Sequence, residues 1–516
     1  MVQYMDNQSG FNQWNQMNAP KKHFGFSSLF WWLMLFLFAW WIMGVWFRPQ
    51  NTEIKEVAPI TIEQSNTKTR NIASEDVSFD VQGLRISNVY LNKHKKDAAS
   101  NEHVALLNND NNFVEIGYVS SDVPVPNINT QWEMKSGEMH WDNPSVHFMR
   151  KISVDGYVIN VTDTVKNKTN HEISIAPYTQ ITQNAKDKAA GVVETGGIVY
   201  ANSKLDYVNW NKLNKKSFAY SSVNASIGFA EQYWETIASM DVSDQTITLK
   251  KSGDLYFAQT NALPIKIAPK SEQTINTYVF SGPRQSDVLN SAAQHIPGIS
   301  KTMDYGWFWF FAQPMLWTIN WLYALVGNYG VAIILMTLML RLLIWPLTRK
   351  SYVSTMAMQK MQPELQRVQK LYANDKMRLQ MEMMKIYQTH KTSPMSGCLP
   401  MLIQIPIFFA LYKALLISVP MRSAQFLWIS DLATMDPYFI LPILMGATMW
   451  LQQYLQTPPK TAGMNEVAAS TQRVMKWMPV LFTVLFAWMP AGLVLYWTIS
   501  NVFGIFQMYI IKKTLK

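Results

Sequence analysis

Six long apolar segments constrain this chain of 516 residues more than any other feature. The first, 29–47, contains no charged residue and is long enough to cross about 30 Å of hydrocarbon as an α-helix. Five more follow closely after residue 322: 323–347, 398–419, 437–455, 475–489 and 491–511. The pattern predicts a multi-span α-helical membrane protein with six transmembrane helices, five of which form a core over 322–516.

A long polar stretch, 48–304, separates the first apolar segment from the other five. It is rich in Asn and Ser, and apolar and polar residues alternate in runs such as VSFDVQGLRISNVYL and GYVINVTDTV. Alternation with a period of two is typical of half-buried strands. We therefore expect an inserted all-β domain. The only cysteine of the chain, Cys398, lies outside this stretch, so the domain must be held by its apolar core rather than by disulfides.

The distribution of Lys and Arg predicts how the chain is oriented in its membrane. The connection 349–391 contains nine basic and three acidic residues, and such an excess near spans marks a cytoplasmic loop. Six spans then place both termini in the cytoplasm and 48–304 in the periplasm, with residues 1–23 inside. Segment 29–47 could instead be a cleaved signal peptide. It is longer than a usual signal core and no small-residue cleavage motif follows it, so we favour an uncleaved anchor over 24–47.

Signatures of catalysis are scarce in this sequence. It has no phosphate-binding loop of the GxxxxGK[ST] type, no HExxH, no GxSxG and no CxxC, and its eight histidines are scattered. His140 and His147, with Asp142 between them, could hold a metal, but in the run MHWDNPSVHFMR they fit better as decoration of neighbouring strand faces. The sequence therefore predicts that the chain is not an enzyme and uses no cofactor or metal.

A fixed positive charge interrupts the second apolar segment. Arg341 lies in the run LMTLMLRLLIWPLTRK, and an arginine in the middle of a bilayer costs from about 3 to more than 10 kcal/mol. One explanation is snorkelling. Arg341 precedes Arg349 by eight residues, about 12 Å along a helix, so its side chain could reach part of the way to the inner interface.

A wet cavity is the alternative explanation. Thr337 lies one helical turn before Arg341, and Gln404 interrupts the third apolar segment. The sixth segment is interrupted by three more polar residues: Thr498, Ser500 and Asn501. None of the six segments contains Asp or Glu, so Arg341 has no carboxylate partner within them. This absence disfavours an ion-coupled transporter, which would use acidic relays near the midplane, and favours a recess that attracts anionic groups of a guest.

Four runs of this chain closely resemble the YidC/Oxa family of membrane protein insertases: RLLIWPLTRKSYVSTMAMQKMQPELQ, SGCLPMLIQIPIFFALY, DPYFILPILMGATMW and MPAGLVLYWTISN. The resemblance covers all five C-terminal apolar segments in order. The first segment and the polar stretch agree in size and place with the bacterial form that carries a large periplasmic domain. The resemblance implies a helical bundle enclosing a hydrophilic groove that is open to the cytoplasm and the lipid.

The resemblance also assigns roles to particular residues. The essential arginine of the family falls on Arg341. Its groove positions fall on Thr337, Gln404 and Trp497. The apolar path along which a guest helix leaves falls on Phe408, Met445 and Leu485, the last of which is often Phe in relatives. Lys413, late in the third segment, has no family role, and we expect it to snorkel to the outer interface. For 48–304 the resemblance implies a β-supersandwich of the kind found in sugar-binding proteins.

The implied function is insertion of membrane proteins without covalent chemistry. A short polar tail enters the groove from the cytoplasm, the field of Arg341 favours its carboxylates, and the adjoining apolar segment slides into lipid, driven by burial at around 25 cal/mol per Å². The resemblance implies nascent membrane proteins, the lipid bilayer and the Sec translocon as partners, with no sequence-specific nucleic acid, at the bacterial inner membrane. Any ribosome contact would use the cytoplasmic loops, because the C-terminal run IIKKTLK is short.

Two accessory segments and one rival interpretation complete the predictions. The spacing of apolar residues over 353–388, with a break near Asn374 and Asp375, predicts a cytoplasmic helical hairpin over 349–392. Its methionines either form the core of the hairpin or capture apolar guest segments. The aromatic run 305–321 predicts an interfacial helix on the outer leaflet. The rival is an anchored carbohydrate-binding protein, which we disfavour because one helix anchors adequately and five further spans would be superfluous.

Overall fold

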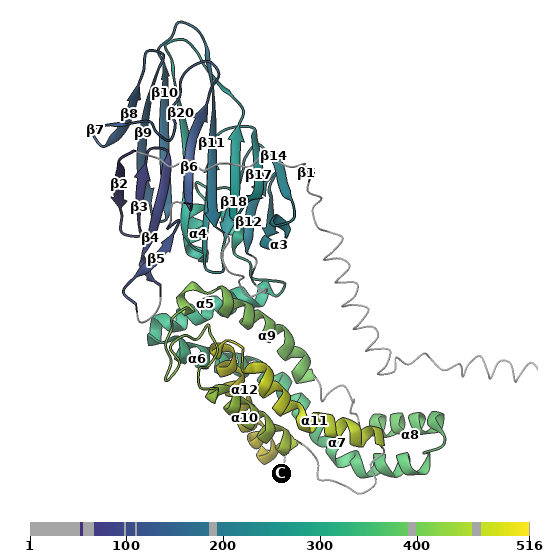
Figure 1. The fold of residues 1–516 in the computed structure, drawn as a ribbon. Helices are drawn as coiled ribbons and strands as arrows, with labels where there is room; N and C mark the ends of the chain where they lie inside the picture. The colour runs from purple at the N-terminus through teal and green to yellow at the C-terminus, as the bar shows by residue number, and fades with distance from the viewer. Residues whose placement is uncertain are drawn as a thin grey trace, which may run out of the picture. The chain divides into compact units, whose positions relative to one another are not determined.

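The computed structural model describes residues 52–54, 67–96, 100–108, 111–184, 193, 195–390, 399–456 and 466–514. The chain divides into two compact units, Met1–Thr52 and Glu53–Lys516. The predicted N-terminus 1–23 and anchor 24–47 lie outside the described residues, and so does Cys398. Within the second unit, a β domain is followed along the chain by a helical core (Figure 1).

The first sheet of the β domain contains strands from both halves of that domain. Its strands are β1 (Thr52–Ile54), β2 (Thr69–Ala73), β3 (Val77–Gln82), β4 (Arg85–Lys95), β5 (His103–Leu106), β6 (Phe113–Val119), β11 (Ile173–Asn184), β14 (Ser217–Ser222), β17 (Gln245–Ser252), β18 (Leu255–Ala262) and β19 (Ile265–Ile267). They are ordered β1-β14-β17-β18-β11-β6-β4-β3-β2, with β19 beside β11 and β5 beside β4. Strands distant in sequence are therefore neighbours in the sheet.

The second sheet contains the remaining strands of the domain. They are β7 (Glu133–Lys135), β8 (Glu138–Asp142), β9 (Val146–Asp155), β10 (Val158–Asn167), β12 (Gly196–Ala201), β13 (Lys204–Asn209), β15 (Ser226–Ala230), β16 (Trp234–Met240) and β20 (Glu272–Pro283), in the order β13-β12-β15-β16-β20-β10-β9-β8-β7. Short helices accompany the sheets: α3 (Trp210–Leu213), α4 (Ser286–Ala292) and the 3-10 turn η1 (Ile299–Thr302).

Alternation of apolar and polar residues explains the two-sheet arrangement. In β3 the side chains of Val77, Phe79 and Val81 are buried, whereas the residues between them are only partly so. Apolar side chains of both sheets, such as Phe79 and Phe280, belong to one buried cluster. The two runs from which strands were predicted form β3, β4 and β10, and the all-β prediction for this domain is confirmed.

One buried ion pair within the second sheet is linked by a tyrosine to the first sheet. Arg150 of β9 donates from Nε to Oδ1 of Asp163 in β10 at 2.7 Å and from Nη2 to Oδ2 at 2.8 Å. The hydroxyl of Tyr118 in β6 donates to Oδ2 of the same carboxylate at 2.6 Å. Burial, together with the Asp163 charge, raises the pKa of Tyr118. The β domain therefore neutralises its buried arginine with a carboxylate that is itself fully hydrogen-bonded.

The helical core contains longer helices joined by short connections. They are α5 (Trp309–Val326), α6 (Tyr329–Leu343), α7 (Trp345–Leu371), α8 (Lys376–Thr389), α9 (Leu399–Ile417), α10 (Ile440–Gln456), α11 (Glu466–Phe486) and α12 (Ala491–Thr514), with the 3-10 turn η3 (Val419–Met421) after α9. Helix α12 packs against α6, α10, α7 and α9. It is therefore the central helix of this part of the chain, and most of its side chains up to Ser500 are buried.

The apolar segment 323–347 is broken rather than continuous. Gly327, at a φ of +68°, ends α5, and the side chain of Asn328 begins α6 by accepting a hydrogen bond from the Val331 N–H at 3.1 Å. The chain then bends by 64° between α6 and α7, where Pro346 lies in the first turn of α7. The single span predicted over 323–347 is therefore corrected to the end of α5, all of α6 and the start of α7.

A helix that spans a membrane must be long enough and apolar enough to cross the hydrocarbon. Among the described helices, α12 meets both criteria. Helices α6 and α7 pass only when they are taken together as one broken span, which would be the second. Shorter apolar stretches are Gln404–Ile417 in α9 and Lys476–Phe486 in α11. The count of six transmembrane helices stays a prediction. The outward surface of the core is nevertheless apolar, and large side chains about half exposed or more include Trp317, Phe409, Ile443, Leu481, Val484 and Phe506.

Two further segments have different bounds from those predicted. Helix α7 continues without a break from the core to Leu371, so the hairpin predicted over 349–392 begins at Trp345. The chain turns before α8, whose first turn is capped by the side chain of Asp375 through the Arg378 N–H at 3.0 Å. The interfacial helix predicted over 305–321 is α5, which begins later and extends further. One face of α5 is buried and the other exposes aromatic residues: Trp309, Phe310, Trp317 and Trp321.

Candidate functional site

Arg341 lies in the last turn of α6 and is half-buried. Its Nε donates a hydrogen bond to Oγ of Ser500 in α12 at 2.7 Å, and its Nη2 donates to the same hydroxyl. Across the described ranges, the side-chain hydrogen bonds of this guanidinium go to the Ser500 hydroxyl, and it forms no ion pair with a carboxylate. The charge is thus held by a neutral hydroxyl. An arginine held in this way keeps its attraction for an incoming anion.

Polar side chains connect Arg341 to α9 by way of α12. Ser500 and Tyr496 lie one helical turn apart on α12, so their side chains share a face of that helix. Gln404 in α9 donates from Nε2 to the Tyr496 hydroxyl at 2.7 Å. Ser500 and Tyr496 are each 1% exposed. We refer to Arg341, Ser500, Tyr496 and Gln404 as the polar network; it joins α6, α12 and α9.

Two predicted groove residues have other partners. The hydroxyl of Thr337, fully buried one turn before Arg341, donates to the backbone carbonyl of Ile333 in its own helix at 2.7 Å. The indole ring of Trp497 packs edge-to-face against Phe408 and Phe486, with ring centroids 5.4 and 5.1 Å apart. The structure therefore brings Arg341 and Gln404 into one network. Sequence reasoning missed the preceding residue, Tyr496, which supplies the hydroxyl that Gln404 contacts. The spacing of four residues between Tyr496 and Ser500 was the signal for it.

The three residues predicted to form an apolar path do not share an exposed face. Leu485 near the end of α11 is 52% exposed, and Phe408 in α9 is half-buried. Met445 in α10 is fully buried, and its backbone carbonyl accepts a long hydrogen bond from Nδ2 of Asn501. Of the three, Phe408 and Leu485 are reachable from outside the bundle, while Met445 lies inside it.

A second buried amide lies further along α12. Gln507 is 1% exposed, and within the described parts of the chain neither its Nε2 nor its Oε1 has a hydrogen-bond partner. Leaving a buried polar group unsatisfied costs about 1–3 kcal/mol, and such groups are normally satisfied by ordered water. Sequence reasoning missed Gln507 as well.

Comparisons with known proteins agree over both parts of the chain. The model of the 60Kd inner membrane protein family matches residues 321–516, and the model of the YidC periplasmic domain matches residues 73–318. The membrane protein insertase YidC of Rickettsia bellii is 32% identical over 510 residues, covering 89% of this chain and 90% of that protein. The chain belongs to the YidC family of membrane protein insertases. The insertase YidC of Rickettsia canadensis is 33% identical over 517 residues, with the same shares covered.

Membership of the YidC family confirms the resemblance seen in the four sequence runs. The family models describe an inner membrane protein with a periplasmic domain, and the relatives are named as insertases rather than enzymes. Among solved structures, a galactose mutarotase related enzyme from Lactobacillus acidophilus is 8% identical, with a TM-score of 0.32, and covers 42% of this chain and 97% of its own. So weak a likeness says nothing about sugar binding by the β domain.

The environment of Lys413 differs from our expectation that this side chain reaches the outer interface. Its side chain is 7% exposed, and the ammonium forms an ion pair with Asp304 in the connection that leads into α5. Asp304 also accepts a hydrogen bond from the Gly306 N–H at 2.8 Å. Gly306 has a φ of +72° and lies close enough that an added Cβ would meet the Lys413 stem at 3.4 Å. The expectation that Lys413 snorkels is therefore corrected, because its ion pair with Asp304 joins α9 to the connection that leads into α5.

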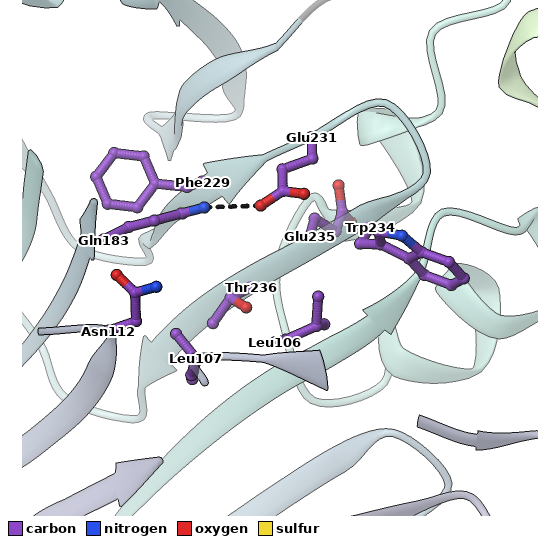
Figure 2. A pocket seen from close by; sticks show the side chains of 9 residues that line it. All are labelled: Leu106, Leu107, Asn112, Gln183, Phe229, Glu231, Trp234, Glu235 and Thr236. Atoms are coloured by element: carbon purple, nitrogen blue, oxygen red, sulfur yellow. Dashed lines mark hydrogen bonds between the residues drawn. The ribbon is translucent and has the colours of Figure 1, made fainter. Parts of the chain in front are cut away.

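A small cavity in the β domain bears on the carbohydrate-binding interpretation. It is lined by Gln183, Phe229, Glu231, Trp234 and Glu235 among others, and Gln183 donates to Glu231 at 2.8 Å (Figure 2). Its volume is about 10 Å³, which is roughly the space that one water needs. This cavity cannot admit a sugar ring.

Proposed function

We propose that this chain inserts membrane proteins through a hydrophilic groove in the helical core, alone or beside the Sec translocon, and that the polar network lines this groove. The observation that carries the proposal is the environment of Arg341, whose guanidinium is held by the Ser500 hydroxyl and by no carboxylate of the described chain. Membership of the YidC family supports the activity itself.

The field of Arg341 explains how a polar tail is drawn in. A carboxylate about 4 Å from a guanidinium gains about 4 kcal/mol at an effective dielectric constant of 20. That gain offsets part of the desolvation of the tail. The hydroxyls of the polar network lower the remaining barrier, because they offer hydrogen bonds that dry hydrocarbon lacks. The polar tail then leaves the groove on the outer side of the membrane, and its charge stays screened during this passage.

The apolar part of the guest follows a different surface. Phe408 and Leu485 lie on α9 and α11, where large apolar side chains are exposed to the surroundings of the core. A guest helix sliding along them into lipid is driven by burial of about 25 cal/mol per Å² of apolar area. Met445, being inside, acts in this scheme by supporting that surface from behind rather than by touching the guest.

The cytoplasmic segment fits recruitment of apolar guests. In the hairpin of α7 and α8, Met361 is buried between the helices, whereas Met377, Met381 and Met384 of α8 are 75%, 53% and 42% exposed. Their flexible thioethers are suited to contact with varied apolar segments. In this scheme the loop 349–391 and both termini are cytoplasmic, the β domain is periplasmic, and any ribosome contact uses the cytoplasmic loops.

A thiol-accessibility experiment tests for the groove. Cysteines replace single residues in a Cys398→Ser background, in the changes Thr337→Cys, Arg341→Cys, Gln404→Cys and Trp497→Cys. We expect each to react with a membrane-impermeant thiol reagent added from the cytoplasmic side but not from the periplasmic side. A thiol must ionise to react, and hydrocarbon suppresses ionisation.

The matched controls are Leu481→Cys and Val484→Cys, whose side chains are exposed on the apolar surface of α11 and should stay protected in the membrane. Protection at all four groove positions would leave snorkelling as the account of Arg341 and contradict the groove. Reaction from both sides would mean a pore through the membrane and favour a transporter.

A further inference from the structure

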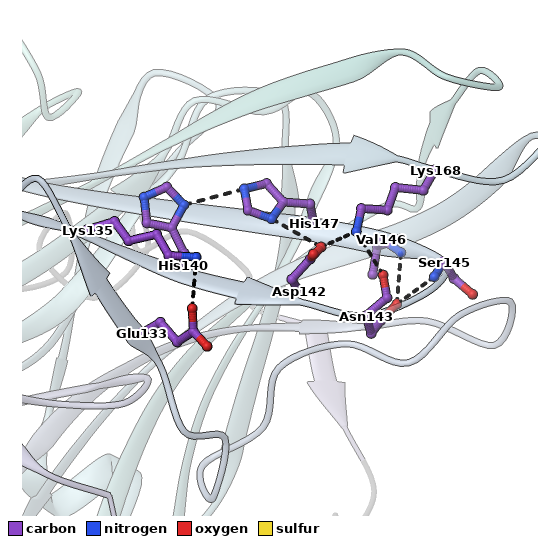
Figure 3. Close-up of polar contacts among 9 residues, drawn as sticks. All are labelled: Glu133, Lys135, His140, Asp142, Asn143, Ser145, Val146, His147 and Lys168. Atoms are coloured by element: carbon purple, nitrogen blue, oxygen red, sulfur yellow. Dashed lines mark hydrogen bonds and ion pairs between the residues drawn. The ribbon is translucent and has the colours of Figure 1, made fainter.

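Two histidines face each other on the outer face of the second sheet of the β domain. In the register of the β8–β9 pair, Asp142 lies opposite His147 and His140 lies diagonally from it. Nδ1 of His140 and Nε2 of His147 are 3.4 Å apart, with ring centroids separated by 5.4 Å (Figure 3). The two side chains are 15% and 29% exposed, so small solutes can reach them.

A carboxylate faces the outer nitrogen of each ring. Nδ1 of His147 lies 3.2 Å from Oδ1 of Asp142, and Nε2 of His140 lies 3.8 Å from Oε2 of Glu138. The Asp142 carboxylate also forms an ion pair with the Lys168 ammonium. Each carboxylate therefore favours a proton on the outer nitrogen that it faces.

The inner nitrogens are then left as two acceptors that point at each other. In a neutral imidazole one nitrogen carries the proton and the other carries the lone pair. Nδ1 of His140 and Nε2 of His147 are 3.4 Å apart, so either one donates to the other or, with both protons on the outer nitrogens, both offer lone pairs to a cation. Such a pair is satisfied by a cation between the two rings.

The separation of these nitrogens fits one ion. Two imidazole ligands at a tetrahedral angle, with zinc–nitrogen bonds of 2.0–2.1 Å, lie roughly 3.3–3.4 Å apart. Metal-bound histidines usually donate their other N–H to a carboxylate, and Asp142 takes that place beside His147 at 3.2 Å. We propose that His140 and His147 together bind a divalent transition-metal ion of the zinc class on the outer face of the β8–β9 hairpin, with water as the remaining ligands.

The site is open rather than closed by protein. Among the described residues, no group of three or more His, Cys, Asp or Glu side chains converges on one point, so the ion would keep exchangeable water. Lys168 and Lys135 pair with Asp142 and Glu133, which leaves the histidines as the available ligands. Imidazole ligands select zinc, copper or nickel over magnesium or calcium. The bound ion would tie β8 to β9 near an edge of the sheet.

The test is calorimetric titration of the purified full chain in detergent with zinc chloride, in the Cys398→Ser background. We expect one saturable site per chain. His140→Gln and His147→Gln should each weaken zinc binding at least tenfold. Asp142→Asn should weaken it by about tenfold. The matched control is His103→Gln, an exposed histidine in the other sheet, which should leave the affinity within twofold of the parent.

A second measurement does not depend on variants. One equivalent of Cu²⁺ added to the parent chain should give an electron paramagnetic resonance spectrum with coupling to two imidazole nitrogens. The absence of saturable zinc binding, equal affinity in the parent and both histidine variants, or coupling to fewer than two nitrogens would overturn the proposal. In those cases the 3.4 Å contact is a shared proton between the two rings.

Discussion

The β domain and the helical core each bury an arginine, and they treat it in opposite ways. Arg150 makes two hydrogen bonds to the Asp163 carboxylate between the two sheets and is 2% exposed. Among the described residues, the Arg341 guanidinium donates its side-chain hydrogen bonds to one neutral hydroxyl, that of Ser500. A paired buried charge is inert toward other ions, whereas a charge held by neutral groups keeps its field. Arg150 therefore stabilises the fold of the β domain, whereas in our proposal Arg341 stays available to attract an anionic group.

The strongest expected effect comes from breaking the pair in the β domain. Asp163→Leu leaves the Arg150 guanidinium buried without a counter-charge, and we expect the free energy of unfolding of the β domain to fall by about 3–5 kcal/mol. Denaturant unfolding followed by circular dichroism on the full chain measures this. The double change Arg150→Met with Asp163→Leu should recover most of the loss. A fall of less than 1 kcal/mol in the single variant would show that Arg150 is not neutralised as described.

Glu235 in β16 is intermediate between the two cases. Its Oε1 accepts from the Thr302 hydroxyl at 2.8 Å, while Oε2 lies 3.4 Å from Nε of Arg284 and has no hydrogen bond within the described chain. Burial raises the pKa of Glu235 from 4.5 to about 7, although Arg284 opposes the shift. The folded protein therefore holds a proton at pH values where the unfolded chain has lost it.

The sign of the resulting pH dependence follows from linkage. Because the folded-state pKa of Glu235 is raised, its contribution to stability is fully present below about pH 4.5 and is lost as the pH rises through about 7. We expect the free energy of unfolding of the β domain to fall by up to about 3 kcal/mol between pH 5 and pH 8. Glu235→Gln should flatten this slope. An unchanged slope in that variant would assign the pH dependence to other groups.

Removing one hydroxyl from the polar network should have a smaller effect, and on function. Tyr496→Phe takes away the hydroxyl that accepts the hydrogen bond of Gln404, one turn from the serine that holds Arg341. We expect insertion of substrates with acidic tails to slow by about two- to tenfold, as the loss of about one hydrogen bond implies. Tyr509→Phe, which removes the hydroxyl of an exposed tyrosine on the same helix, is the matched control. Equal slowing in both variants would contradict a role for the network.

Deleting most of the β domain should change insertion least. Every residue of the polar network lies in the helical core, so removal of residues 60–280, with the segment from Tyr305 kept, should leave insertion of a small single-span substrate largely intact. The measurement is protease protection of that substrate in vesicles with matched amounts of the two proteins. A complete loss of insertion would transfer the function to the β domain and favour the carbohydrate-binding interpretation.

Periodicity was enough to predict the β domain, because alternation in β3 and β10 records which face is buried. It did not predict which strands pair. That order joins segments far apart in sequence, such as β10 and β20. The span over 323–347 was misjudged for a local reason. Its mean apolarity hides Gly327, Asn328 and Pro346, which divide it into parts of three helices.

At the candidate site the sequence pointed to the charge and to Ser500, which holds it, but not to Tyr496. Arg341 and Gln404 stood out because each interrupts an apolar run. Tyr496 did not, because tyrosine is common in apolar helices, and only the packing of α9 against α12 shows that its hydroxyl meets Gln404. Lys413 was misread for the same reason. Its partner, Asp304, is 109 residues away in sequence and belongs to no apolar segment.

The central claim is that Arg341 attracts charge instead of fixing structure. It is tested most directly by insertion of two matched single-span substrates whose short tails differ only in having Asp or Asn, with the parent, Arg341→Lys and Arg341→Ala. We predict that Arg341→Lys retains most insertion of both, and that Arg341→Ala slows the acidic tail at least about tenfold more than the neutral one, as loss of at least 1.4 kcal/mol of attraction implies. Equal slowing of both tails by Arg341→Ala, in a protein that still folds, would contradict the account.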